Sequence, residues 1–299
     1  MHRYFHSGLQ TASEIELPEW ADFACDRSGE PDVSIVLADG RSPAFPADGS
    51  TFASGDIAGF CIGGVGGWKL EGGRRMVLYP SLATDPAELR LFTMGSAWGL
   101  LGYQRGHGMW HGSAVARDTR AVLFCGDAGE GKSTMAAAMV AAGAALVGDD
   151  LGRVEPGESH ALIHPFSSRL KLCDEAVEHL GWRRHVIQRD VMREGKFHCF
   201  VKDHCAGQPA LHLSAVVVLS SGDGPALEQL SGAEALSEVL RGTIYRPEAL
   251  EAMGRWGEQG ALAARIVSQT PVFRLRRPRA LDALDQSVEL VSGMLDRLG

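Results

Sequence analysis

Short apolar runs separated by glycine-rich and polar stretches dominate the first hundred residues and predict strands. Residues 32–37 fit a strand, and residues 68–79 fit a hairpin with a glycine turn. The glycine-rich stretch 55–67 is expected to form loops and tight turns. A helix should begin at Asp85, which precedes a proline and suits the N-cap. We therefore expect a β-rich domain over 1–106, closed by a helix.

The remaining chain, 107–299, mixes buried strands with helices of periodic apolar pattern. The expected strands are 113–116, 121–125, 144–147, 161–165, 211–219 and 272–275. The expected helices are 132–142, 174–180, 231–240, 247–255, 258–268 and 281–298. The helix at 231 carries a capping box, Ser231 with Glu234. The expected fold class is mixed α/β.

Composition narrows the choice of partners. The chain has 299 residues, of which 45% are apolar and 22% charged, as in an ordinary globular protein. Its net charge of −8 argues against nucleic acid or an anionic membrane as partner. No apolar run is long enough for a transmembrane helix, and the N-terminus does not resemble a signal peptide. Six scattered cysteines indicate free thiols, so we expect a cytoplasmic protein.

The most informative segment, 126–133, reads Gly-Asp-Ala-Gly-Glu-Gly-Lys-Ser and completes the phosphate-binding pattern G-x-x-x-x-G-K-[ST]. It lies between an expected buried parallel strand and an expected helix that stops at Gly143, which is the context this loop requires. The pattern predicts a nucleoside triphosphate with a divalent metal. Lys132 should reach the outer phosphates, and the Ser133 hydroxyl should bind Mg²⁺. The expected nucleotide-binding residues are Gly126, Asp127, Ala128, Gly129, Glu130, Gly131, Lys132, Ser133 and Thr134.

Two carboxylates, Asp149 and Asp150, follow the expected strand 144–147. Only 15 residues separate Ser133 from Asp149, which predicts one helix between two adjacent strands and places both carboxylates at a strand's carboxyl end. Side chains alternate along a strand, so the two face one way only if the chain turns. Then Asp149 can bind Mg²⁺ and Asp150 can act as a base; the alternative is a solvated turn.

Residues 198–205 bring two histidines and two cysteines close together in sequence. A zinc site is one interpretation. The spacing does not match a zinc knuckle, which favours a strand and loop with incidental His and Cys.

His111-Gly112, the segment 126–133 and Gly148-Asp149-Asp150 together resemble the catalytic domain of HPr kinase/phosphorylase. The resemblance is close over 109–153. A looser one, over about 107–298, is to HPr-kinase-related serine kinases, several of which phosphorylate the C-terminal serine of lasso-peptide precursors. It implies a P-loop kinase domain of the HPr kinase/PEP-carboxykinase-like type, ATP and Mg²⁺ as cofactors, and a serine on a peptide or small protein as acceptor. It is compatible with a homo-oligomer.

The resemblance also implies residue roles. Asp150 would be the base, Lys132 would neutralise phosphate charge, and His111 would lie near the phosphates or the base; a structural histidine is the alternative. Basic residues in matching elements are candidates for stabilising charge or gripping a carboxylate, although each could be a solvated surface cation. These residues are Arg169, Lys171, Lys202, Arg241 and Arg246. The elements 243–247 and 272–278 also belong to the looser resemblance.

Departures from the family limit what is implied. Thr134 stands where HPr kinase/phosphorylase has a glutamate, the family's Arg-Gly signature is missing, and residues 1–106 do not match its N-terminal domain. A dedicated peptide kinase is therefore expected rather than a phosphorylase, with residues 1–106 recognising the acceptor. The alternatives are a kinase for a small molecule or saccharide and a non-catalytic nucleotide-binding module.

Overall fold

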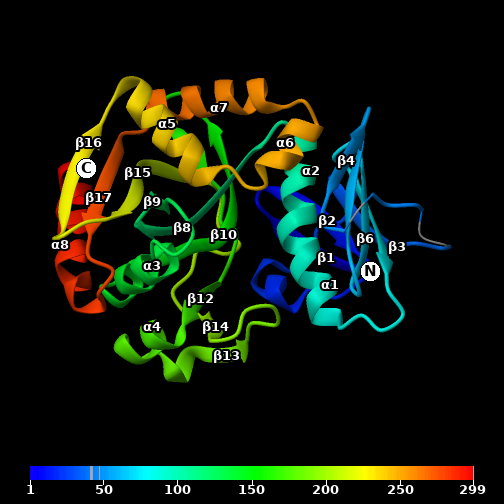
Figure 1. Cartoon of the computed structure of the whole chain (residues 1–299), viewed down its shortest axis with the longest axis horizontal. Coiled ribbons are helices and arrows are strands. Elements are labelled where there is room, and N and C mark those ends of the chain that lie inside the picture. Colours follow the sequence, from blue (N-terminus) through cyan, green and yellow to red (C-terminus); the bar gives the residue numbers. More distant parts are fainter. Residues whose placement is uncertain (41–42, 47, 299) are drawn as a thin grey trace. The chain divides into compact units, whose positions relative to one another are not determined.

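The computed structural model describes residues 1–40, 43–46 and 48–298 (Figure 1). The chain comprises two compact units, one of Met1–Met109 with Tyr245–Gln259 and one of Trp110–Ile244 with Gly260–Gly299. Residues 245–259 thus differ from the expected assignment to 107–299. Within the first unit, the Tyr103 hydroxyl donates to the carbonyl of Tyr245 at 2.7 Å.

The first unit is built on a seven-stranded sheet in the order β1-β2-β3-β7-β6-β5-β4. Its strands are β1 (His2–His6), β2 (Leu9–Ser13), β3 (Val33–Leu37), β4 (Thr51–Ser54), β5 (Ile57–Ile62), β6 (Gly66–Glu71) and β7 (Arg75–Pro80). Antiparallel pairing of Glu71 with Arg75 confirms the hairpin predicted at 68–79, and β3 confirms the strand predicted at 32–37. The pattern did not predict β1, β2 or β4.

The prediction of loops and tight turns at 55–67 is confirmed only in part: turns occupy 55–56 and 63–65, but β5 and the start of β6 take up the rest. Gly64 lies in a turn with a left-handed backbone, whereas Gly59 and Gly67 in the strands serve close packing. A Cβ at Gly59 would lie 2.7 Å from the Phe52 ring, and one at Gly67 would meet the Phe45 ring. These two glycines therefore leave room for the phenylalanine rings.

The helices of the first unit follow the predicted start. Asp85 is the N-cap and accepts a 2.8 Å hydrogen bond from the backbone N–H of Ala87. The helical segment contains one turn of π-helix, where Thr93 and Ser96 are buried. Its parts are α1 (Pro86–Phe92), η2 (Thr93–Ala97) and α2 (Trp98–Gln104); the unit also contains η1 (Pro18–Phe23) and α6 (Pro247–Ala252).

The second unit contains a seven-stranded sheet in the order β11-β10-β8-β9-β15-β17-β16, in which β11 also pairs with β15. That pairing closes the first five strands into a ring. Its strands are β8 (Gly108–Arg117), β9 (Arg120–Cys125), β10 (Ala145–Pro156), β11 (Ala161–Ile163), β15 (Leu211–Ser221), β16 (Ala226–Leu230) and β17 (Val272–Arg277). A smaller sheet of order β12-β14-β13, which the pattern did not predict, holds β12 (Arg169–Cys173), β13 (Val186–Arg189) and β14 (Lys196–Phe200).

Two expectations about the strands beside the 126–133 loop need correction. β9 is parallel to β15, as expected of a buried parallel strand, but β8 lies between β9 and β10, so the helix does not join adjacent strands. The strand expected at 144–147 continues to Pro156, and Asp149 and Asp150 lie within it. The helical run and apolar strand were visible in sequence, but their order in the sheet depends on the antiparallel β8–β9 pairing.

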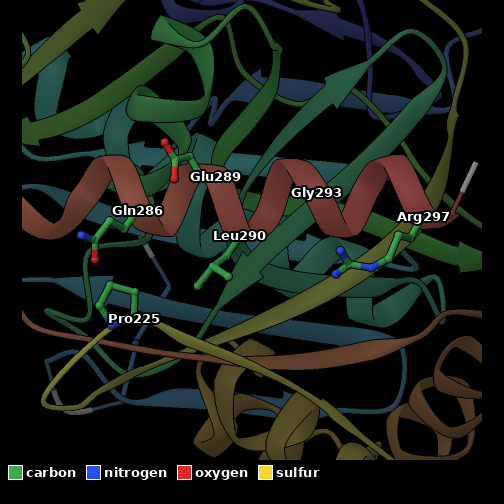
Figure 2. A pocket seen from close by; sticks show the side chains of 6 residues that line it. All are labelled: Pro225, Gln286, Glu289, Leu290, Gly293 and Arg297. Atoms are coloured by element: carbon green, nitrogen blue, oxygen red, sulfur yellow. The ribbon is translucent and has the colours of Figure 1, made fainter.

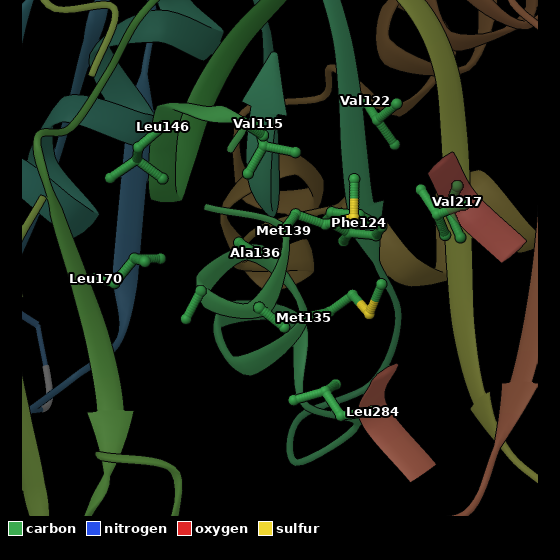
Figure 3. Packing of buried hydrophobic residues seen from close by; sticks show 14 of the residues in the cluster. Val115, Val122, Phe124, Met135, Ala136, Met139, Leu146, Leu170, Val217 and Leu284 are labelled. Atoms are coloured by element: carbon green, nitrogen blue, oxygen red, sulfur yellow. The ribbon is translucent and has the colours of Figure 1, made fainter. Parts of the chain in front are cut away.

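Side chains alternate along the strands of the second unit's seven-stranded sheet, and this builds a hydrophobic core on each face of the sheet. Val122 and Phe124 of β9 pack in one cluster with Met135 and Met139 of α3, as Figure 3 shows, while Leu123 joins another. The second cluster includes residues of α5 and α7. The helices of the unit are α3 (Lys132–Ala141), α4 (Asp174–His179), η3 (Arg183–His185), α5 (Gly232–Thr243), α7 (Trp256–Gln269), η4 (Leu281–Ala283) and α8 (Leu284–Leu298).

Helix α5 lacks the predicted capping box. Ser231 is the N-cap, but its side chain makes no capping hydrogen bond. Glu234 instead forms a 2.9 Å ion pair with Arg274 of β17. For the Glu234 carboxylate, a charge-assisted bond to a guanidinium group is stronger than a hydrogen bond from an exposed backbone N–H. Among the described residues, no helix is both long and apolar enough to cross a membrane.

Candidate active site

The 126–133 loop connects β9 directly to α3 and contains three glycines with left-handed backbone. Their φ angles are 133° at Gly126, 89° at Gly129 and 80° at Gly131. Residues that carry a side chain rarely adopt such φ angles, so the loop conformation requires glycine. At Gly126 a Cβ would also lie 2.7 Å from the carbonyl oxygen of Leu219. The loop therefore leads into the N-terminus of α3, where backbone N–H groups favour an anion.

Lys132, the first residue of α3, points back over the loop. Its Nζ donates to the carbonyl oxygens of Gly126 at 2.9 Å and Asp127 at 3.1 Å. The side chain is only 9% exposed, and this burial lowers the pKa of Lys132. The ammonium group is thus held within the loop.

Asp149 connects the loop to two other elements. Its Oδ1 accepts hydrogen bonds from Ser133 at 2.9 Å and from Ser113 at 2.6 Å. Its Oδ2 accepts one from the backbone N–H of Lys171 at 2.8 Å. The side chain is 8% exposed, and these bonds fix a buried carboxylate against the first turn of α3.

Asp150 has a left-handed backbone, with φ of 90°, inside β10. This breaks the alternation of the strand, and both carboxylates reach the same residue: Asp150 Oδ2 lies 3.2 Å from Lys171 Nζ. On its other side, His111 Nε2 lies 3.7 Å from Asp150 Oδ1. A non-glycine residue with such backbone strain persists only where its surroundings hold it, which is typical of functional sites.

The charges around Asp150 set its protonation. Burial acts to raise the pKa of Asp150, but Lys171, then His111 and Arg193, outweigh it and lower the pKa to about 2. Burial lowers the pKa of His111, although the neighbouring Asp150 acts against it. At neutral pH, therefore, Asp150 is ionised and His111 is neutral.

Of the predicted basic residues, two belong to β12. Lys171 contacts both aspartates, and its pKa is raised because the attraction of Asp150 outweighs burial. Arg169 lies two residues earlier and hence on the same side of the strand, and its backbone N–H donates to Ser167 Oγ at 3.0 Å.

The other basic residues lie elsewhere. Arg241 of α5 pairs with the loop residue Asp127 and with Glu238. Lys202 is exposed beyond the end of β14. Arg246 belongs to the first unit, where it donates to the carbonyl of Gly49 at 2.9 Å.

Sequence reasoning missed two residues that contact this site. Ser113 has a visible signal, because it stands two residues after His111 on one strand and thus shares its face. Arg277, at the end of β17, donates to the carbonyl of loop residue Glu130 at 3.0 Å. Only the folding of β17 beside β15 brings it there.

The oxygen atoms of Ser133 and Asp149 suit a hard cation. Mg²⁺ is usually held by one or two protein oxygens together with substrate phosphates and water, so this pair beside an anion-binding loop fits it. Across the described residues, no cluster of three or more His, Cys, Asp or Glu could hold a metal by itself.

In the segment 198–205, His198 Nε2 lies 3.1 Å from Asp190, and Cys199 packs in the core.

A pocket on the surface of α8 has no part in this arrangement (Figure 2). Its lining combines a few apolar groups with exposed polar side chains, none of them from the 126–133 loop. The residues are Pro225, Gln286, Glu289, Leu290, Gly293 and Arg297.

Comparisons with known proteins add little to the geometry. No family model and no curated protein matches the chain. Among solved structures, the chain is similar to the HPr(Ser) kinase/phosphatase from Coxiella burnetii, with 13% identity over 64% of this chain and 99% of that chain. The TM-score is 0.34. A similarity at this level establishes neither a common fold nor a function.

Proposed function

We propose that this chain is an ATP-dependent kinase that transfers the γ-phosphoryl group to a serine hydroxyl of a peptide or small protein. The observation that carries the proposal is the pair of carboxylates beside the loop. Asp149 bonds Ser133, and the left-handed Asp150 lies on the same side, held by Lys171. A module that only binds nucleotide needs the loop and a metal ligand, but it has no use for a second, strained carboxylate.

At the nucleotide end, the backbone N–H groups of 126–134 bind the phosphates of ATP, and Lys132 neutralises their charge. Ser133 and Asp149 would hold Mg²⁺, which when bound would offset the charge of the phosphate oxygens. Lys132 leaves its bonds to loop carbonyls for the stronger interaction with phosphate.

In the transfer step, the serine Oγ of the acceptor attacks the γ-phosphorus. The bond from that phosphorus to the bridging oxygen breaks, and ADP leaves with the electron pair. The hydroxyl proton passes to Asp150. With a pKa of about 2, Asp150 is a weak base but is ionised at neutral pH. In a loose transition state the proton leaves late, so orientation of the hydroxyl matters more than basicity.

The flanking basic groups have supporting roles. Lys171 holds Asp150 in place, and neutral His111 lies beside it without adding a competing positive charge. We assign Arg169, on the same side of β12 as Lys171, to stabilising charge at the acceptor end.

The finer proposal concerns the acceptor. The resemblance of 107–298 to HPr-kinase-related serine kinases favours the C-terminal serine of a lasso-peptide precursor. The first unit, which contains residues 1–106, is then the proposed site of acceptor recognition.

The test uses the full chain with Mg²⁺ and ATP, and mass spectrometry of three pools. One contains peptides ending in serine, a matched pool ends in alanine, and the third contains sugars and small hydroxylated metabolites. We expect phosphate on the serine peptides and none on the alanine peptides. Phosphate on the third pool alone would identify a small-molecule kinase. Tight ATP binding without transfer to any pool would leave a non-catalytic module.

A further inference from the structure

Arg277 is a buried cation that lies against the phosphate-binding loop but outside its sequence motif. Arg277 is the last residue of β17, and it is 5% exposed. Nη2 donates to the carbonyl oxygen of Glu130 at 3.0 Å, and Nη1 donates to that of Pro278 at 3.2 Å. The buried Nε has no hydrogen-bond partner among the residues that the structure describes.

The guanidinium group also packs directly on the loop backbone. Gly131 has φ of 80°, and a Cβ at this position would overlap Arg277 Nη2. The neighbouring Glu130 is held at its other end as well, because its carboxylate accepts from Arg279 Nη2 at 2.8 Å and from Ser221 at 3.1 Å. Thus both the main chain and the side chain of Glu130 are fixed from outside the loop.

The charge of Arg277 is only partly compensated, because the nearby Glu130 carboxylate makes its own hydrogen bonds to Arg279 and Ser221 instead. Its two hydrogen bonds go to neutral carbonyl groups, and burial lowers the pKa of its guanidinium although the charge of the Glu130 carboxylate acts against this. A buried charge is costly unless an opposite charge compensates for it. The loop beside it gathers N–H groups for anions, so a bound polyphosphate is the compensating charge that this position would meet.

We propose that Arg277 is a positioning residue for nucleotide binding, which holds the Glu130–Gly131 peptide in its phosphate-binding orientation and favours polyphosphate through its charge. The inference rests on the nucleotide binding in the proposed function. Because its effect depends on phosphates in the loop, Arg277 should matter for ATP and ADP and much less for AMP.

The test measures calorimetric binding of ATP, ADP and AMP, each with Mg²⁺, to the full chain and three variants. Arg277→Met removes the charge and both hydrogen bonds, and Arg277→Lys keeps the charge. Arg276→Met is the matched control, since this neighbouring arginine is 48% exposed and pairs with Glu228. Thermal unfolding is recorded for each variant.

We expect Arg277→Met to weaken ATP binding by about tenfold or more and AMP binding by less than about threefold. Arg277→Lys should recover part of the ATP affinity, and the control should bind as the parent does. With the acceptor in hand, Arg277→Met should raise KM for ATP and leave kcat nearly unchanged, which general loosening of the fold would not do.

Equal losses for ATP and AMP, or an unchanged ATP affinity, would overturn the proposal. If Arg277→Met does not fold, the same comparison is made with Arg277→Lys, where a loss confined to ATP and ADP supports it and any other pattern overturns it. A parent chain that binds ATP but transfers no phosphate refutes the kinase and leaves this assignment standing. A parent that binds no nucleotide refutes both.

Discussion

Asp150 combines an unfavourable backbone with a favourable charge environment, and replacing it separates catalysis from folding. The shift of its pKa from 3.8 to about 2 corresponds to about 2.4 kcal/mol. Because its side chain is 40% exposed, solvent screening reduces this to roughly 1 kcal/mol. A lowered carboxyl pKa stabilises the fold above the unfolded pKa, so this contribution is present at neutral pH and is lost as pH falls from about 4 to 2.

The left-handed φ of 90° acts in the opposite direction. For an ordinary side chain it costs roughly 1–2 kcal/mol, less for asparagine and nothing for glycine. We therefore expect the free energies of unfolding of Asp150→Asn and Asp150→Gly to lie within about 1 kcal/mol of the parent's. That of Asp150→Ala should be lower by about 2 kcal/mol.

The assay compares three quantities for each variant: chemical unfolding, calorimetric ATP binding, and phosphate transfer to the serine peptide. Asp150→Asn and Asp150→Gly should bind ATP as the parent does while transfer falls by about 10²–10⁴-fold, because the acceptor hydroxyl loses its proton acceptor. Transfer at the parental rate by Asp150→Asn would refute the base assignment. An Asp150→Gly variant far less stable than the parent would refute the estimate of backbone strain.

Three further results are expected. Lys132→Ala should weaken ATP binding and slow turnover together, each by about tenfold or more, in binding and kinetic assays. Ser113→Ala removes the 2.6 Å bond to Asp149 and should raise the Mg²⁺ concentration needed for half-maximal transfer several-fold, measured by metal titration. Because burial lowers the pKa of His111, transfer should decline only at a pH below the ordinary range of histidine, where His111 becomes protonated, and a pH–rate profile of His111→Gln should lack that acidic limb.

Local sequence was sufficient to predict the segment from β9 to α3. The apolar run 121–125, the glycines of the loop and the helix formers after Lys132 all express short-range preferences, and the structure contains each element within a residue or two. The same holds for the N-cap at Asp85. Where glycines serve packing, as at Gly59 and Gly67, the same local reading failed, because the Phe52 and Phe45 rings that they accommodate lie outside the segment 55–67.

The sequence by itself determined the residue types of the candidate site: a phosphate-binding pattern, a lysine and serine in register, and two carboxylates a short helix later. Tertiary structure decided how they meet. Strand β10 runs through the aspartates, and the left-handed backbone at Asp150 places both beside Lys171. Ser113 and Arg277 come from strands far apart in the chain. Such contacts depend on sheet order and register, which pairing between distant segments fixes and no local pattern encodes.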